Sequence, residues 1–114
     1  MVARNHLLAA PPYVVEQTLK SFGENLRTAR IRRRLTIEEV ARKIGTGTRA
    51  ISDAERGKPS TSIAVYVALL WAFGLMNAFK TLADPGLDSE GQILALSRER
   101  KRVRVGRKGL DNDF

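Results

Sequence analysis

The most regular alternation of apolar and polar residues lies in the stretch 36–57, which reads T-I-E-E-V-A-R-K-I-G-T-G-T-R-A-I-S-D-A-E-R-G. In its first half, apolar residues recur at spacings of three and four, as on one buried face of a helix: Ile37, Val40, Ala41 and Ile44. Thr36 with Glu39 three residues later is a capping-box pattern that predicts the start of this helix. Gly45 predicts its end, because glycine readily takes the left-handed conformation.

A second short helix is predicted before Gly57. Its pattern turns Ala50, Ile51 and Ala54 inward, and it turns four polar residues outward: Thr48, Arg49, Ser52 and Asp53. Two short helices joined by a tight turn that contains glycine describe a helix-turn-helix, whose second helix enters the major groove of DNA.

One long helix is predicted upstream of this pair. Pro12 suits the first position of a helix. A single apolar stripe then continues to about Arg34: Val15, Leu19, Phe22, Leu26 and Ala29.

Two further helices are predicted downstream, which makes the expected fold an all-α domain of five helices. Ser60, Thr61 or Ser62 can cap the fourth helix. This helix is apolar nearly all round from Ile63 to Phe73, so it must be buried on two sides, with the second side a candidate subunit or partner interface. Residues 75–82 read as the fifth helix, stopped by Asp84-Pro85-Gly86.

Four segments resemble, in order, the helix-turn-helix of the phage-repressor type, the XRE or Cro-like family. They are F-G-E-N-L-R-T-A-R from Phe22, L-T-I-E-E-V-A from Leu35, G-T-G-T-R-A-I-S-D-A-E-R-G from Gly45 and A-F-G-L from Ala72. The resemblance implies that Arg30 pairs with Glu55 as a structural bridge between the first helix and the recognition helix. The chain departs from the family at Ile37, where glutamine is usual, and at Gly47, where Ser or Thr opens the recognition helix. Thr46 or Thr48 is then expected to supply the cap.

Within this family, the chain looks most like the small antitoxins of HipB type. The resemblance lies in the long first helix, the A-E-R-G-K-P-S-T-S-I block, the L-A-D-P stop and the R-x-R-K-R-V-R tail. It implies that the chain binds a HipA-like serine/threonine kinase toxin and represses its own operon with it. Two alternatives stay open: a stand-alone XRE-type regulator, and a protein-interaction module with weak DNA binding.

The charge balance agrees with a polyanionic partner. Twenty Lys and Arg against twelve Asp and Glu give a net charge of +8. The expected lack of surface aromatic residues for base stacking argues against single-stranded RNA. The helix-turn-helix pattern points to double-stranded DNA as the polyanion. The chain has no cysteine, which fits a reducing cytoplasm, and no apolar run long enough to span a membrane.

The expected DNA contacts fall into two groups. Phosphate contacts are expected from Thr36, from Lys58, and from the helix N-terminus at Thr46, Gly47 and Thr48. Base contacts are expected from Arg49, which can fork onto guanine, and from Ser52 and Asp53 one turn later. Asp53 can instead hold the Arg49 guanidinium in place. Because one short helix reads few base pairs, we expect a homodimer on a palindromic operator.

Little in the sequence suggests an enzyme. Glu38 and Glu39 are adjacent, so they splay about 100° apart around a helix and cannot face one another as an acid/base pair. His6 has no neighbours that complete a metal or catalytic site, and no cofactor is expected.

The expected organisation has three parts: a flexible arm at 1–11, the DNA-binding domain at 12–83 and a basic tail at 84–114, partly helical or disordered. Asp88 or Ser89 can cap a short helix through Leu96. Residues 98–108 then carry seven basic residues against one acid, which suits a DNA-backbone arm, a partner-binding segment or a solvated tail. The alternation R-V-R-V also permits a short edge strand.

Overall fold

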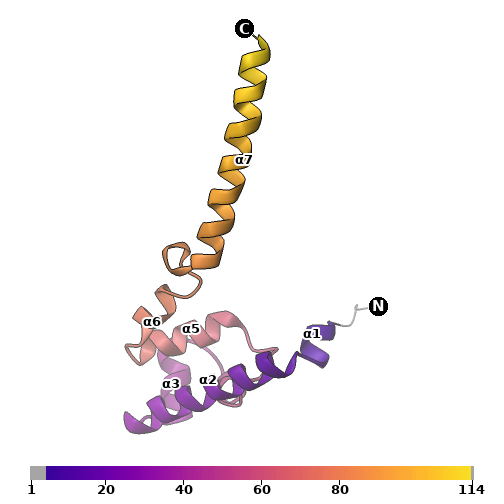
Figure 1. The fold of residues 1–114 in the computed structure, drawn as a ribbon. Helices are drawn as coiled ribbons and strands as arrows, with labels where there is room; N and C mark the ends of the chain where they lie inside the picture. Colours follow the sequence, from indigo (N-terminus) through magenta and orange to yellow (C-terminus); the bar gives the residue numbers. More distant parts are fainter. Residues whose placement is uncertain (1–4, 114) are drawn as a thin grey trace. The chain divides into compact units, whose positions relative to one another are not determined.

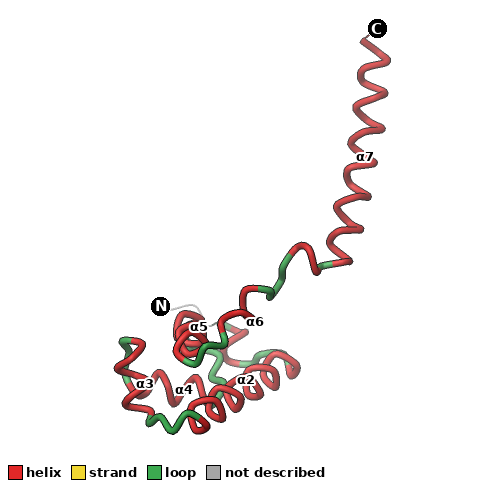
Figure 2. Tube along the Cα trace, turned by 90° about the vertical axis from the view of Figure 1, so that its left-hand side faces the viewer, coloured by secondary structure: helices red, strands yellow, loops and turns green. Residues whose placement is uncertain are grey.

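A computed structural model describes residues 5–113 of the 114-residue chain, with side chains up to Arg104. Over these residues every regular element is helical, which confirms the all-α prediction (Figure 2). None of the described helices is long and apolar enough to cross a membrane.

Figure 1 shows the helices in chain order. They are α1 (His6–Ala9), α2 (Tyr13–Arg32), α3 (Ile37–Ile44), α4 (Thr48–Glu55), α5 (Ile63–Ala72), α6 (Met76–Lys80), the 3-10 helix η1 (Pro85–Leu87) and α7 (Ser89–Asp113). The chain divides between Phe79 and Lys80 into two compact units, so α1 to α5 and nearly all of α6 belong to the first unit.

Local sequence signals place the α3–α4 pair. The Thr36 hydroxyl accepts a hydrogen bond from the Glu39 amide at 3.1 Å, and the Thr36 amide donates to Glu39 Oε1 at 3.2 Å, so the capping box is complete. Gly45 ends α3 with φ = 79°, in the left-handed region. The turn into α4 is therefore short, and the two helices pack against each other.

The core of the first unit is built mainly from α2, α3, α4 and α5. Its largest fully buried side chains come from all four helices: Leu26, Val40, Ile51 and Leu69. The end of α2 is joined to the end of α5 by Arg33, which donates to the Phe73 carbonyl at 2.9 Å and lies over the Phe73 ring. Helix α4 is thus held against a packed scaffold from one side.

A close backbone crossing fixes α2 against the end of α4. A Cβ atom on Gly23 would lie 2.6 Å from the carbonyl oxygens of Ala54 and Glu55, and 2.7 Å from the Gly57 nitrogen. Gly57 faces the backbone of α2 in turn and has φ = 68°. Only residues without a side chain permit this approach, which sets the position of α4 against α2.

The N-terminal part differs from its prediction in two ways. A one-turn helix, α1, forms where a loose arm was expected, because Asn5 Oδ1 accepts hydrogen bonds from the Leu7 and Leu8 amides. Residues 1–4 of the expected arm lie outside the described part. The buried face of α2 also starts later than predicted, since Val15, the first residue of the predicted apolar stripe, is 40% exposed. The first fully buried residue of α2 is Gly23.

Helix α5 is buried less completely than its composition suggested. Tyr66, Leu69 and Leu70 are buried in the core, but Ile63 and Trp71 are 63% and 57% exposed. The Ser62 hydroxyl caps α5 by accepting from the Ala64 amide. The predicted fifth helix is shorter than residues 75–82 and covers Met76–Lys80.

The second unit consists mainly of one helix. The tail was expected to be partly helical or disordered, with an edge strand as an option; α7 covers Ser89–Asp113, so the residues of the R-V-R-V alternation are helical rather than extended. Asp88 caps it, since its Oδ1 accepts from the Gly91 amide at 2.9 Å. The R-V-R-V alternation is too short to impose a strand among neighbours that favour a helix.

Candidate nucleic-acid interface

Helix α4 begins with an open N-terminus. Gly47 is its N-cap in an extended conformation, and no side chain caps the helix. The expectation that Thr46 or Thr48 supplies the cap is therefore wrong. The first backbone N–H groups of α4 keep their capacity to donate, and the helix dipole adds partial positive charge at this end. Such an end can bind an anion such as a phosphate group.

The outward face of α4 carries the polar residues that the pattern placed there. Thr48 and Arg49 are exposed, whereas Ser52 and Asp53 are half-buried one turn later. On the opposite face, Ile51 and Ala54 have no exposed surface. The helix therefore presents a narrow polar face while its apolar face is fixed in the core.

Asp53 contacts Lys58 rather than Arg49. Its Oδ2 lies 3.6 Å from Lys58 Nζ, and its backbone carbonyl accepts from the Lys58 amide at 3.0 Å. Among the described side chains, Arg49 is in no salt bridge, so its guanidinium is available for an acceptor outside the chain. The four-residue spacing between Arg49 and Asp53 could not predict this ion pair, because the turn after α4 brings Lys58 back beside Asp53.

Lys58 is held in place from a second side by α5. The Tyr66 hydroxyl donates to the Lys58 carbonyl at 3.0 Å, and the Tyr66 ring stacks on Phe22 with centroids 5.3 Å apart. Burial raises the pKa of the Tyr66 hydroxyl, which keeps it protonated as a donor. The backbone of Lys58 is thus fixed while its side chain stays about half exposed.

Arg30 and Glu55 form the bridge between α2 and α4 that the family resemblance implies. Arg30 Nε donates to Glu55 Oε2 at 2.6 Å, Nη2 donates to Oε1 at 3.1 Å, and Nη1 donates to the Leu35 carbonyl at 2.8 Å. The hydrogen bond with Glu55 raises the pKa of Arg30, against the opposing effect of burial. This bidentate pair orients the end of α4, and little of it is exposed for contact with another molecule.

Thr36 occupies the start of α3, at an exposed position. Its hydroxyl oxygen accepts the capping hydrogen bond, but the hydroxyl hydrogen can still be donated. Thr36 can therefore serve the cap and a phosphate oxygen at once.

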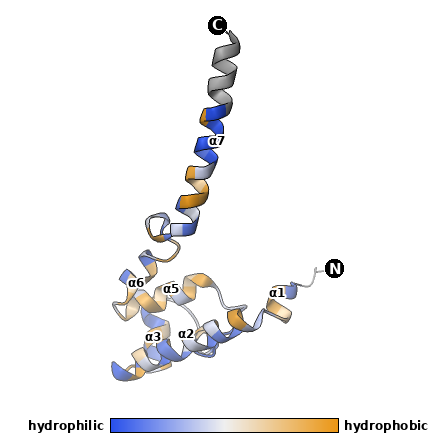
Figure 3. Cartoon of the chain, in the orientation of Figure 1, coloured by the Kyte–Doolittle hydropathy of each residue, from blue (hydrophilic) through white to orange (hydrophobic). Residues whose placement is uncertain are grey.

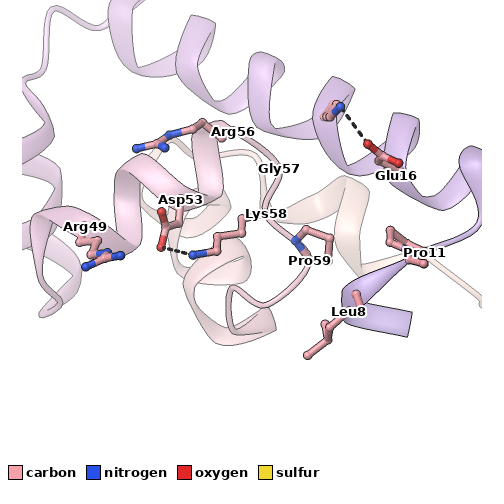
Figure 4. Close-up of a pocket in the computed structure, with 12 residues that line it drawn as sticks. Leu8, Pro11, Glu16, Arg49, Asp53, Arg56, Gly57, Lys58 and Pro59 are labelled. Atoms are coloured by element: carbon pink, nitrogen blue, oxygen red, sulfur yellow. Dashed lines mark hydrogen bonds and ion pairs between the residues drawn. The ribbon is translucent and has the colours of Figure 1, made fainter. Parts of the chain in front are cut away.

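A hollow of about 770 Å³ lies beside the polar face of α4 (Figure 4). It is lined by α1 and the start of α2 on one side and by α4 and the following turn on the other: Leu8, Ala9, Ala10, Pro11, Glu16, Lys20, Arg49, Asp53, Arg56, Gly57, Lys58 and Pro59. Its two acids each pair with a lysine, Glu16 with Lys20 and Asp53 with Lys58. Arg49 and Arg56 therefore give the hollow a positive character.

Sequence reasoning missed Arg56 and Lys20 in this hollow. Arg56 is exposed immediately after α4, and its place beside Gly57 in a positively charged chain was the available signal. Lys20 gave no signal, because only folding brings the second turn of α2 to the turn after α4.

Two short helices joined by a tight glycine turn, the second with an exposed polar face, define a helix-turn-helix protein. Residues 21–78, just over half of the chain, match the family model described as a helix-turn-helix domain, of the XRE-like superfamily. The chain belongs to this family. Neither the comparison with curated proteins nor the comparison with solved structures gave a match.

Proposed function

We propose that the protein is a sequence-specific regulator that binds double-stranded DNA and represses transcription. The observation that carries this proposal is the polar face of α4, where an exposed Arg49 without a salt bridge follows an uncapped helix N-terminus. An exposed arginine of this kind can bind base edges, and an uncapped helix N-terminus can bind a phosphate.

The contacts divide by chemistry. The amides and hydroxyls at Thr46, Gly47 and Thr48 bind one phosphate at the N-terminus of α4. Lys58 and Thr36 bind phosphates on either side of the groove. Arg49 reads guanine through O6 and N7, and Ser52 contacts a neighbouring base. Asp53 positions the Lys58 side chain through their ion pair.

A homodimer on a palindromic operator follows from the size of the recognition helix. Eight residues reach few base pairs, so two half-sites about one helical turn apart are needed for specificity. The exposed apolar side chains of α5 and the turn after it supply a surface for a second copy: Ile63, Trp71 and Leu75.

The narrower proposal is that the protein is the antitoxin of a HipBA-like module and also binds a HipA-like kinase. Its support is the resemblance of the A-E-R-G-K-P-S-T-S-I block and of the tail. The same exposed apolar surface of α5 favours a second candidate function, a protein-interaction module with weak DNA binding. Gel filtration of the chain alone and with the product of a neighbouring gene separates these from a stand-alone regulator.

Arg49→Ala should reduce discrimination between operator variants by about 1–3 kcal/mol at one base pair, because the bidentate contact with guanine is lost. The measurement is a titration of single-substitution operator duplexes at one fixed salt concentration. Unchanged relative affinities across the duplexes would show that Arg49 does not face a base.

Lys58→Ala is the matched control, since it removes one cation near the same helix. It should weaken binding to every duplex to a similar extent and lower the dependence of log K on log salt by about 0.9. A variant that changed the ranking of the duplexes would instead place Lys58 against a base edge.

A further inference from the structure

Helix α7 exposes its described surface to solvent. Within its own unit it packs against η1, and every residue from Gln92 to Arg104 is exposed. At about 1.5 Å per residue, its 25 residues extend over about 37 Å. Most helices in proteins owe their stability to tertiary packing, and α7 has little of it within its own unit.

The charge of α7 is concentrated in one segment. Residues 98–108, here called the basic cluster, hold seven Lys and Arg and one acid within about three helical turns. Like charges meet at helical spacings, as in Arg98 with Arg102 and Arg100 with Arg104, and such pairs destabilise a helix. Among the described side chains of α7, no salt bridge offsets this repulsion.

A polyanion fits the basic cluster better than a second copy of α7 does. The spacing of Ile93, Leu96, Arg100 and Val103 would form the seam of a coiled coil, but a parallel copy would set Arg100 against Arg100. The exposed apolar residues also lie mainly before the basic cluster, as the change from orange to blue along α7 shows (Figure 3). The excess of seven basic residues over one acid is complemented by an anionic partner.

We infer that the basic cluster of α7 is a second DNA-binding element, which binds phosphates along the duplex without reading its sequence. The inference rests on the proposed function, since the DNA held by α4 is the polyanion present when the helix binds. Each phosphate contact releases a counterion, so the cluster adds affinity that falls steeply with salt. The two helices then have different roles. Helix α4 selects the sequence, and α7 increases the affinity for DNA of any sequence.

The test replaces Arg98, Arg100, Arg102 and Arg104 together with glutamine, in the full-length chain. Glutamine forms helices almost as well as arginine, so α7 is kept while four charges are removed. The matched control replaces the same four arginines with lysine, which keeps the charges. Binding of the operator duplex and of a scrambled duplex is measured at several salt concentrations.

For the glutamine variant, the slope of log K against log salt should fall by about 2 to 4 on both duplexes, while the ratio of the two affinities stays the same. The lysine variant should keep the wild-type slope. A glutamine variant with the wild-type slope and intact operator preference would overturn the role of α7 and leave the role of α4 standing. Wild-type protein that bound neither duplex would overturn both.

Discussion

Glu55→Ala should lower the free energy of unfolding by about 1–3 kcal/mol, because it leaves the partly buried Arg30 guanidinium without its counter-charge. The two side chains are only 12% and 8% exposed, and the pair makes two parallel hydrogen bonds. The remaining bond from Arg30 to the Leu35 carbonyl satisfies one donor and no charge. Urea unfolding followed by circular dichroism measures the loss.

The control is Glu16→Ala, which removes a carboxylate from the exposed ion pair with Lys20 on the same helix as Arg30. That pair is 3.0 Å long, but its side chains are 40% and 51% exposed, so its loss should cost less than about 1 kcal/mol. Equal losses for Glu55→Ala and Glu16→Ala would show that the bridge between α2 and α4 does not hold the fold together.

Gly23→Ala should destabilise the protein by about 2 kcal/mol or more, although alanine is the better helix former. The added Cβ would lie 2.6 Å from two backbone carbonyl oxygens, which cannot rotate away as a side chain can. Helix α2 must therefore shift away from the end of α4. We expect a lower melting temperature and, since α4 is then displaced, weaker operator binding by the same variant.

Gly47→Ala is the control for Gly23→Ala. A Cβ at Gly47 would have no neighbour within 4 Å, and the residue has an ordinary φ of −79°. Its effect should stay below about 1 kcal/mol, which is the cost of alanine at an N-cap. A melting temperature for Gly23→Ala as high as that for Gly47→Ala would contradict the close crossing.

The sequence predicted those features that depend on a few neighbouring residues. The capping box at Thr36 and the left-handed Gly45 are local, so the spacing alone located α3 and the turn after it. The outward residues of α4 followed from its period. The pairing of Arg30 with Glu55 spans 25 positions, and it came from the family resemblance rather than from any pattern.

Features that depend on how distant segments of the chain come together in the fold could not be predicted from the sequence. The Gly23 crossing and the partner of Asp53 are set by how the turn after α4 folds back. The missing cap of α4 depends on side-chain rotamers, which residue type alone does not give. For the tail, the apolar residues and the charges left both a helix and an edge strand open, and α7 forms there with Asp88 capping its first turn.

The most direct test of the proposed function is binding to a duplex of the chain's own upstream DNA against a scrambled duplex, at several salt concentrations. Recognition through α4 predicts a clear preference for the upstream duplex that survives physiological salt, with two subunits bound at each site. Equal binding to both duplexes that collapses as salt rises would show that only the electrostatic attraction is present, and it would contradict sequence-specific regulation by this protein.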